Sequence, residues 1–408
     1  MHWIEHSNVP VSPRLIQWLL PQLFFCLNLG GVILYAVTAN SLASGLHLST
    51  AQVGSMGGAY FIAYALSQLL LGSSLGSISP RLLLGATAVI AAAGAFVLSI
   101  AQSFEWVMLA RLLMGLGFGT AMVGVVYIIG QLFSSTFAFM VNLSQSIANA
   151  FGAILGLLAP LPILQNFRLP FLIISILLLA NGILMMMFTK DQKQATTDQE
   201  GAQSRANLPT QLANILGNGQ FWISAIYFSG LFASFLAYAD FWNIRFLIDV
   251  FGSSSSLAAM INSGVAWGLS LGGIVTGIWA NRVGCLVPAR ICAWMALVLM
   301  GILYSRPLPG LAVPLMVCLG FFMGAAPLGL AVMNAHVPER YRSLASPILL
   351  TMVFLCGGLL MSSVGSSLAG LPVHAFSTYR AGLNWFLVPI AVAAVASLMM
   401  KPGRTTGA

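Results

Sequence analysis

Long apolar stretches, separated by short polar or Gly/Pro-containing breaks, occupy almost the whole chain. A helix needs about 20 predominantly apolar residues to cross a membrane. By this criterion the chain contains twelve candidate spans, at residues 15–42, 50–74, 81–102, 104–132, 137–162, 169–189, 219–247, 255–280, 286–305, 310–335, 343–370 and 379–400. The pattern predicts an all-α polytopic membrane protein with twelve transmembrane helices and short loops.

One polar stretch interrupts this pattern. Residues 190–218 include the segment KDQKQATTDQEGAQSR, which has the composition of an ordinary soluble loop. It divides the spans into two sets of six. We therefore expect an N-terminal six-helix bundle at 1–189, a cytoplasmic linker at 190–218 and a C-terminal six-helix bundle at 219–408.

The composition excludes soluble and disordered proteins. Of the 408 residues, 59% are hydrophobic and only 6% are charged, whereas soluble domains carry roughly 25% charged residues. Disordered chains are poor in apolar residues. The five cysteines form no CxxC pair and lie mostly within apolar segments, so we expect no metal site and no cofactor.

The positive charges indicate topology rather than nucleic-acid binding. The sixteen Lys and Arg residues are scattered singly and form no basic stripe along which a phosphate backbone could lie. With a cytoplasmic N-terminus, eleven of them fall on the cytoplasmic side and four, Arg168, Arg245, Arg306 and Arg380, fall outside. Positive residues favour the cytoplasmic side. We therefore expect the protein to lie in a bacterial inner membrane, with both termini and the linker in the cytoplasm.

The two halves show a faint internal repeat. A shift of 205 residues superimposes four glycines of the first half on four of the second, namely Gly72 on Gly277, Gly115 on Gly320, Gly119 on Gly324 and Gly152 on Gly357. Six spans per half is an even number, so both halves enter the membrane from the same side. The pattern predicts two parallel six-helix repeats with a substrate cavity between them near the bilayer midplane.

Three motifs resemble the major facilitator superfamily of transporters. The family's loop G-x-x-x-D-R-x-G-R-R has a good copy in Gly277-Ile-Trp-Ala-Asn281-Arg282-Val-Gly284, with Asn for Asp, and a degraded copy that ends at Arg81. The segment from Arg111 to Gly119 is similar to its R-x-x-x-G-x-G-x-G signature, and Asn166-Phe-Arg168-Leu-Pro-Phe to its W-R-x-P-F entry into helix six. Together with the repeat, the resemblance covers essentially the whole chain.

The loop motif suggests a conformational latch. A loop arginine can bind helix C-terminal carbonyls and nearby acids at the cytoplasmic surface, which would hold one conformation. We assign this role to Arg81, Gly277, Asn281 and Arg282; alternatively, Arg282 only fixes topology. The paired glycines, Gly273 and Gly277 among them, are expected to allow close helix approach.

Asp240 is the only acidic residue clearly inside a predicted span. An ionisable residue in a membrane is costly, which makes it a candidate functional residue. We interpret Asp240 as a proton-coupling residue. A structural ion pair with Arg245, five residues away, is the main alternative, because a kink in the helix could bring the two together; direct substrate contact is a third.

Arg111 is the second charge within a span, and it needs an anionic or carbonyl partner because it cannot readily deprotonate. The family resemblance implies a role in cavity electrostatics or proton coupling. The alternative is a structural hydrogen-bonding hub. If Arg111 faces the cavity, it favours substrates with a carboxylate or phosphate.

Further polar and aromatic residues in the spans are candidates for lining a substrate cavity. They are Tyr35, Asn40, Tyr60, Tyr64, Asn142, Gln145, Asn149, Tyr238, Trp242, Asn243, Arg245, Trp267 and Asn334. Asn142, Gln145 and Asn149 share one helix face, and such a polar face should point away from lipid. Hydrogen bonding between helices would explain the presence of any single Asn equally well. Tyr and Trp near helix ends could instead belong to the interfacial belt.

These observations favour a secondary active transporter that works by alternating access. No GxxxxGK phosphate loop, hydrolytic constellation or filter-like loop is present in the sequence, so ATP coupling, an enzyme and a channel are disfavoured. Drug–proton antiporters of the resembled family usually carry an acid on helix one and G-x-x-x-G-P on helix five, and both are missing here. We expect a monomer in the lipid bilayer that takes up a small polar or anionic organic solute with protons as the coupling ion. The alternative is a proton-driven exporter of a metabolite, siderophore or drug.

Overall fold

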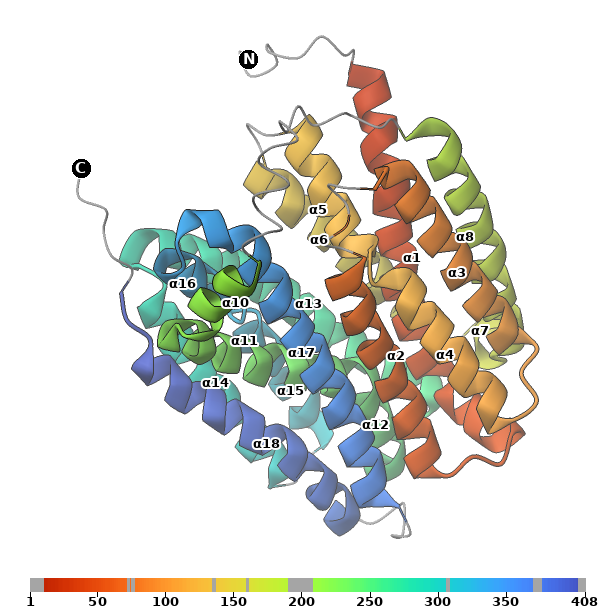
Figure 1. Cartoon of the computed structure of the whole chain (residues 1–408). Coiled ribbons are helices and arrows are strands. Elements are labelled where there is room, and N and C mark those ends of the chain that lie inside the picture. Colours follow the sequence, from red (N-terminus) through yellow and green to blue (C-terminus); the bar gives the residue numbers. More distant parts are fainter. Residues whose placement is uncertain are drawn as a thin grey trace.

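The computed structural model describes residues 11–71, 74, 78–133, 137–158, 161–189, 208–305, 309–369 and 376–402. Within these ranges every regular element is a helix (Figure 1). In the first half these are α1 (Val11–Gly45), α2 (Thr50–Leu70), α3 (Pro80–Ser99), α4 (Phe104–Phe118), α5 (Ala121–Leu132), α6 (Phe137–Leu157), α7 (Pro162–Gln165) and α8 (Arg168–Phe188). In the second half they are α10 (Leu208–Leu216), α11 (Gly219–Ala237), η3 (Tyr238–Trp242), α12 (Asn243–Phe251), α13 (Ser255–Val283), α14 (Leu286–Tyr304), α15 (Pro309–Met323), α16 (Leu328–His336), α17 (Glu339–Leu368) and α18 (Phe376–Met399).

The helices confirm the predicted all-α polytopic fold. Ten helical segments of the described chain are long and apolar enough to cross a membrane, and Leu143–Leu157 is a shorter apolar helix. The remaining predicted span is α2, which has a full 21 residues. Its Gly, Tyr and Gln residues lower its hydropathy, and twelve of its residues are buried against other helices. Contact with protein instead of lipid permits this more polar composition.

Three predicted spans are interrupted where continuous helices were expected. The span 104–132 breaks between α4 and α5 at Gly119 and Thr120, and the span 310–335 breaks between α15 and α16 at residues 324–327, which include Pro327. The ring of Pro327 has no N–H to continue the α-helical ladder. The span 219–247 contains the π-helix η3 and continues as α12 to Phe251. Residues 119 and 324 are related by the 205-residue shift, so the first two breaks occupy equivalent places in the two halves.

The end of the predicted linker also forms a helix. Residues 190–207 lie outside the described ranges, but α10 follows them and packs against α11 and α17. Ile215 is only 1% exposed, and Asn214 Nδ2 donates a hydrogen bond to the Tyr341 hydroxyl at 3.3 Å. The apolar residues at 208, 212, 215 and 216 recur with helical spacing. This short pattern directly follows a polar stretch, so from the sequence alone it is assigned to the linker and not to a helix.

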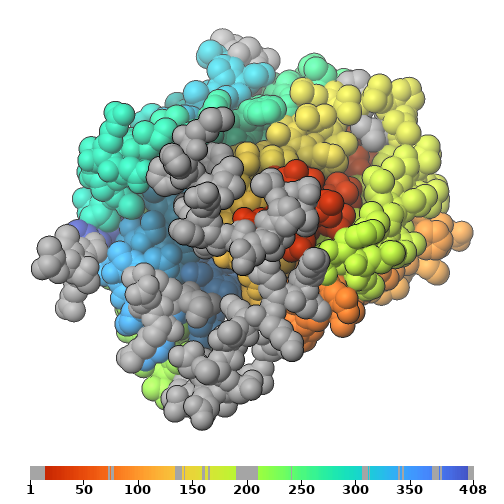
Figure 2. Space-filling model, turned by 90° about the horizontal axis from the view of Figure 1, so that it is seen from above, coloured from red at the N-terminus to blue at the C-terminus, as the bar shows by residue number. Residues whose placement is uncertain are grey.

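The helices pack in two groups. Helices α1–α8 pack mainly among themselves, as do α10–α18, and the main pairs joining the groups are α2 with α17 and α6 with α13. In Figure 1 the first half is red to yellow-green and the second half green to blue. Seen from the end where α1 begins, the two halves lie side by side (Figure 2). The exact boundaries of the two predicted bundles remain a prediction.

The glycine repeat corresponds to repeated helix contacts. A Cβ at Gly115 would collide with the Tyr60 carbonyl oxygen, and a Cβ at Gly320 would collide with the carbonyl oxygen of Val265. Both members of the second pair are shifted by 205 residues from the first. The packing of α2 on α4 is therefore reproduced by α13 on α15, as expected for two parallel repeats.

Two arginines bind the carbonyl ends of neighbouring helices. Arg168 donates from Nη1 and Nη2 to the carbonyl oxygens of Ser99 and Ala101 at 3.3 and 3.1 Å. Arg290 donates from Nε to Ser397 and from Nη2 to Met400, at 3.2 and 3.4 Å. These carbonyls lie at or just beyond the ends of α3 and α18, where they lack intrahelical donors.

We expect Arg290→Ala to lower the melting temperature of the purified protein by a few degrees. A cation at a helix C-terminus contributes about 0.3–1 kcal/mol, and the last α18 carbonyls would lose two donors. Differential scanning fluorimetry in detergent measures the effect. Arg282→Ala is the matched control, since Arg282 also lies in the last turn of a helix, α13, but is exposed and donates to no carbonyl among the described residues. Equal melting temperatures for both variants would contradict this role.

Candidate functional site

Arg111 lies at the centre of a buried aromatic cluster in the first half. Its side chain is 1% exposed, and its guanidinium carbon lies 4.0 Å from the centre of the Tyr35 ring and 4.2 Å from that of Tyr60. Its Nε donates to the carbonyl oxygen of Met56 at 3.3 Å. Gly115, one helical turn later on α4, permits the close approach to α2 that brings Arg111 to Tyr60 and Met56.

The Arg111 guanidinium keeps an unused hydrogen-bond donor. Its Nη1 is buried and has no hydrogen-bond partner. The faces of Tyr35 and Tyr60 stabilise the cation, since a desolvated cation–π contact contributes about 2 kcal/mol, but they accept no conventional hydrogen bond from the guanidinium edge. An unpartnered buried charged donor is costly. This arrangement suits an anionic group that completes the coordination of Arg111.

Aromatic contacts extend the cluster into the second half. Tyr35 donates its hydroxyl to the Val53 carbonyl at 3.0 Å and stacks on Phe241 of η3, with ring centres 5.5 Å apart. Tyr60 donates to Asn28 Oδ1. Tyr64 lies 4.5 Å from the ring of Phe354 on α17. The predicted residues Tyr35, Tyr60, Tyr64 and Arg111 therefore lie together, close to the contact between the halves.

The π-helix η3 is held by a pair of asparagines. The Asn243 N–H bonds to the Tyr238 carbonyl five residues earlier. The side chain of Asn262 on α13 donates to the Ala239 carbonyl at 2.6 Å and accepts from Asn243 Nδ2 at 2.7 Å. Single π-turns are frequent at functional sites. Asp240 belongs to η3, but its side chain lies outside the described residues, so its proton-coupling role stays a prediction and its ion pair with Arg245 stays the alternative.

Arg245 provides a second guanidinium from the opposite half. Its Nε and Nη1 are buried and have no hydrogen-bond partner. It lies close enough to both Tyr35 and Tyr379 to act on them electrostatically. Tyr35 therefore lies within the field of Arg111 from the first half and of Arg245 from the second.

Glycines close the contact between the halves where α1 ends and α2 begins. A Cβ at Gly54 would lie 2.9 Å from the Cα of Gly365 on α17, and a Cβ at Gly58 would collide with Ser362 Oγ. Trp242 fits against Gly54 and Gly365 and donates from Nε1 to the Met361 carbonyl at 3.1 Å. Trp242 thus fills the interface between the halves in this conformation.

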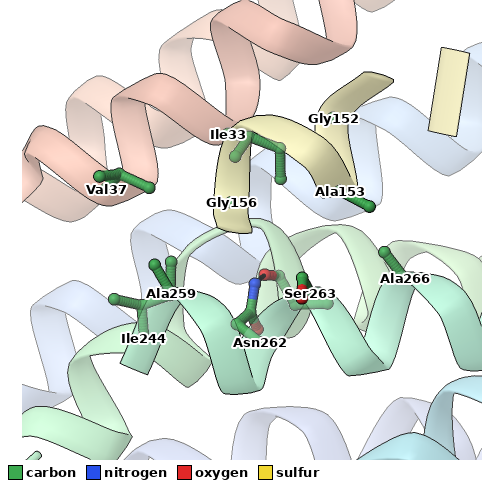
Figure 3. Close-up of a pocket in the computed structure, with 11 residues that line it drawn as sticks. Ile33, Val37, Gly152, Ala153, Gly156, Ile244, Ala259, Asn262, Ser263 and Ala266 are labelled. Carbon is green, nitrogen blue, oxygen red and sulfur yellow. Dashed lines mark hydrogen bonds between the residues drawn. The ribbon is translucent and has the colours of Figure 1, made fainter. Parts of the chain in front are cut away.

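A hollow remains between α6 and α13 near the same contact. Figure 3 shows Ile33 of α1 and Gly156 of α6 facing Ala259, Asn262 and Ser263 of α13. Further along these two helices, Gln145 donates to Asn149 at 3.0 Å and Asn149 donates to Ser270 at 3.5 Å across the halves. The predicted polar face of this span therefore meets the other half, although the side chain of Asn142 lies outside the described residues.

The other predicted site residues make no described contact with Arg111. Asn40 and Asn334 are half-buried, and Trp267 is 43% exposed. Tyr238 is buried against Phe386, and its hydroxyl has no partner.

The residues of the predicted latch lie on the surface of the described chain. Asn281 and Arg282 are exposed, as is Arg81 at the start of α3. A Cβ at Gly277 would meet nothing within 4 Å, so the expectation that Gly277 serves close helix packing is wrong for this conformation. The latch itself stays a prediction. Gly72, in the degraded copy, lies outside the described residues.

Sequence reasoning missed three contributors to the site, Phe241, Phe354 and Tyr379. They lie among 25 phenylalanines and nine tyrosines, and nothing local distinguishes them. Among the described residues, no group of three His, Cys, Asp or Glu side chains could hold a metal ion.

Solved structures with similar folds are membrane transporters. A bacterial homologue of the human lysosomal transporter Spinster, in an inward-facing and unoccupied conformation, superimposes with a TM-score of 0.71 at 18% identity, covering 96% of this chain and 98% of that one. The nucleoside transporter NupG gives 0.66 at 16% identity, with 95% and 98% coverage. A D-xylose–proton symporter gives 0.68 at 14%, with 96% and 98%. At these identities the likeness shows the fold alone.

The chain also matches a family model. Comparison with curated proteins finds no match, but the model described as Major Facilitator Superfamily matches residues 22–359. This range includes Arg111, Tyr35, Tyr60 and Arg245, and it confirms the resemblance seen in the motifs. The protein is thus a transporter rather than an enzyme, and the chain belongs to the major facilitator superfamily.

Proposed function

We propose that this protein transports a small anionic organic solute by alternating access, with Arg111 and Arg245 as its cationic partners. The observation that carries the proposal is the pair of guanidinium groups on either side of the interface. Each has buried N–H groups without a partner, and Arg111 also lies 4.0 Å from the centre of the Tyr35 ring. Arginine is well suited to a carboxylate or phosphate because its planar fork can donate two parallel hydrogen bonds.

Binding between the halves would couple the solute to their movement. A ligand shifts a conformational equilibrium only by its difference in affinity for the two states. An anion held by Arg111 alone would favour neither arrangement, whereas one held by both arginines favours the arrangement that brings them together. The halves would then rock about this site, with the contact between α2 and α17 closing one side.

We further propose that transport is proton-coupled uptake across a bacterial inner membrane, with both termini cytoplasmic. Asp240 is the proposed proton carrier because it is the acidic residue of the π-helix that carries Phe241 and leads to Arg245. A proton bound to the Asp240 carboxylate would enter together with the anion, and its positive charge would offset part of the negative charge that the anion carries. The side where α1 ends would then be external and closed in this conformation.

Transport into liposomes tests this proposal. The purified protein is reconstituted and offered labelled lactate, succinate and inorganic phosphate, with glycerol as the uncharged control, under an inward proton gradient. We expect accumulation of at least one anion and none of glycerol. Accumulation that does not depend on the proton gradient would reject proton-coupled uptake. So would transport that is seen only out of the liposomes when the proton gradient is reversed. If none of the anions is transported, the proposed anionic substrate class is wrong.

The Asp240→Asn variant tests the coupling residue separately. We expect it to lose gradient-driven accumulation and to keep exchange of labelled for unlabelled anion, because exchange needs no net proton movement. Wild-type accumulation by Asp240→Asn would exclude Asp240 as the proton carrier.

A further inference from the structure

Arg245 has a nearby acid with which it does not pair. Asp249 follows it by four residues on α12, and residues at this spacing are neighbours on a helix and commonly form ion pairs. No ion pair joins them in the described chain, and Arg245 Nε and Nη1 have no partner. The Asp249 carboxylate instead accepts a hydrogen bond from the Tyr379 hydroxyl.

Tyr379 is fixed in place by packing. It lies in the first turn of α18 and is 4% exposed. Its ring contacts Phe246, with ring centres 5.8 Å apart, and lines a small pocket with Tyr238 and Leu383. A packed ring has few alternative rotamers, so its hydroxyl is held towards Asp249.

We propose that Tyr379 is a positioning residue that holds Asp249 away from Arg245 and so keeps the Arg245 N–H groups available to a carboxylate or phosphate. This inference rests on the proposed anion site. Without the Tyr379 hydroxyl, the Asp249 carboxylate loses its hydrogen bond and becomes an internal competitor for Arg245. A bound anion must then displace Asp249, which lowers its affinity without removing any group that touches it.

A cycle of variants without any ligand tests the change of partner. Arg245→Gln and Asp249→Asn are measured singly and together by melting temperature, first with Tyr379 present and then in the Tyr379→Phe background. We expect additive effects with Tyr379 and clearly non-additive effects in Tyr379→Phe, because only there do the two charges pair. Equal coupling in both backgrounds would overturn the inference.

Anion binding provides the second readout. Lactate, succinate and inorganic phosphate are titrated separately against the purified proteins, and stabilisation against heat reports binding. For each anion that stabilises the wild type, we expect about tenfold weaker binding to Tyr379→Phe, and recovery to within about twofold in Tyr379→Phe/Asp249→Asn. Recovery distinguishes competition by Asp249 from a general loss of structure.

Tyr227→Phe is the matched control for removal of a buried hydroxyl in the same half. Its hydroxyl donates to the carbonyls of Ala289 and Ala325, and we expect anion affinity to be unchanged. Unaltered affinity in Tyr379→Phe, or weakening that Asp249→Asn fails to reverse, would overturn the positioning role. If no anion stabilises the wild type, the proposed substrate class is wrong, while the ligand-free cycle still decides whether Tyr379 separates Asp249 from Arg245.

Discussion

Arg111→Lys lowers anion uptake by about 100-fold. Lysine carries its charge at a single ammonium and cannot place a flat guanidinium between the rings of Tyr35 and Tyr60, at 4.0 and 4.2 Å, while donating to Met56. A hydrogen bond to a charged group contributes about 1.5–3 kcal/mol, and 1.4 kcal/mol corresponds to tenfold in binding. Initial uptake rates in liposomes, measured over a range of anion concentrations, give the loss.

The control for this substitution is Arg290→Lys. Arg290 also donates to two carbonyls, but these belong to the end of α18 in the second half. We expect near-normal uptake by Arg290→Lys. Near-normal uptake by Arg111→Lys, with the fold retained by circular dichroism, would show that Arg111 is a structural hub and not an anion partner.

Gly58→Val opens the contact between α2 and α17 while both halves stay folded. A Cβ at this position would collide with Ser362 Oγ and the Gly358 carbonyl oxygen, which belong to the other half. Overpacking a close contact costs about 1–3 kcal/mol, enough to shift the equilibrium between two conformations by about 5- to 150-fold. The shift favours the arrangement in which these two helices are apart.

Spin labels at Ser49 and Ala369 measure this opening, since both residues are exposed and lie next to the ends of α2 and α17. We expect Gly58→Val to increase the population with a long distance between the labels. Gly301→Val on α14 serves as the neutral control, because a Cβ there would meet nothing within 4 Å, and Gly115→Val should instead reduce the yield of folded protein, because it collides within the first half. An unchanged distance distribution in Gly58→Val would show that this contact does not control the conformation.

Much of the fold could be predicted because a membrane imposes simple requirements on each helix. The apolar runs located twelve spans, and the glycines at a spacing of 205 indicated two repeats whose contacts the structure confirms at Gly115 and Gly320. The helix breaks were not predictable from apolar runs, because a break changes hydrogen bonding without changing hydropathy. Pro327 was a local signal for one of them, whereas η3 depends on Asn262 from a different helix.

The site was predictable only in part. Arg111 and Arg245 could be identified as candidate site residues from the sequence, because a charged residue within an apolar span is rare and costly. That Arg111 lies between Tyr35 and Tyr60, and that Tyr379 takes the carboxylate of Asp249, depends on the rotation of each helix about its own axis. Helix rotation is set by packing at contacts such as Gly115 with Tyr60, which join residues far apart in the chain.

By itself the sequence determined that this protein is a polytopic helical bundle with two related halves, because the length and apolarity of each span are local properties that the bilayer requires. Only the tertiary structure decided which few charges share a site. Arg111 lies against Tyr35 and Tyr60 because the close contact at Gly115 brings α4 to α2, and Tyr35 in turn stacks on Phe241 of η3, which leads into α12 with Arg245. Electrostatic and hydrogen-bonding interactions depend on distances of a few ångströms between side chains, and the folded packing of the two halves sets those distances.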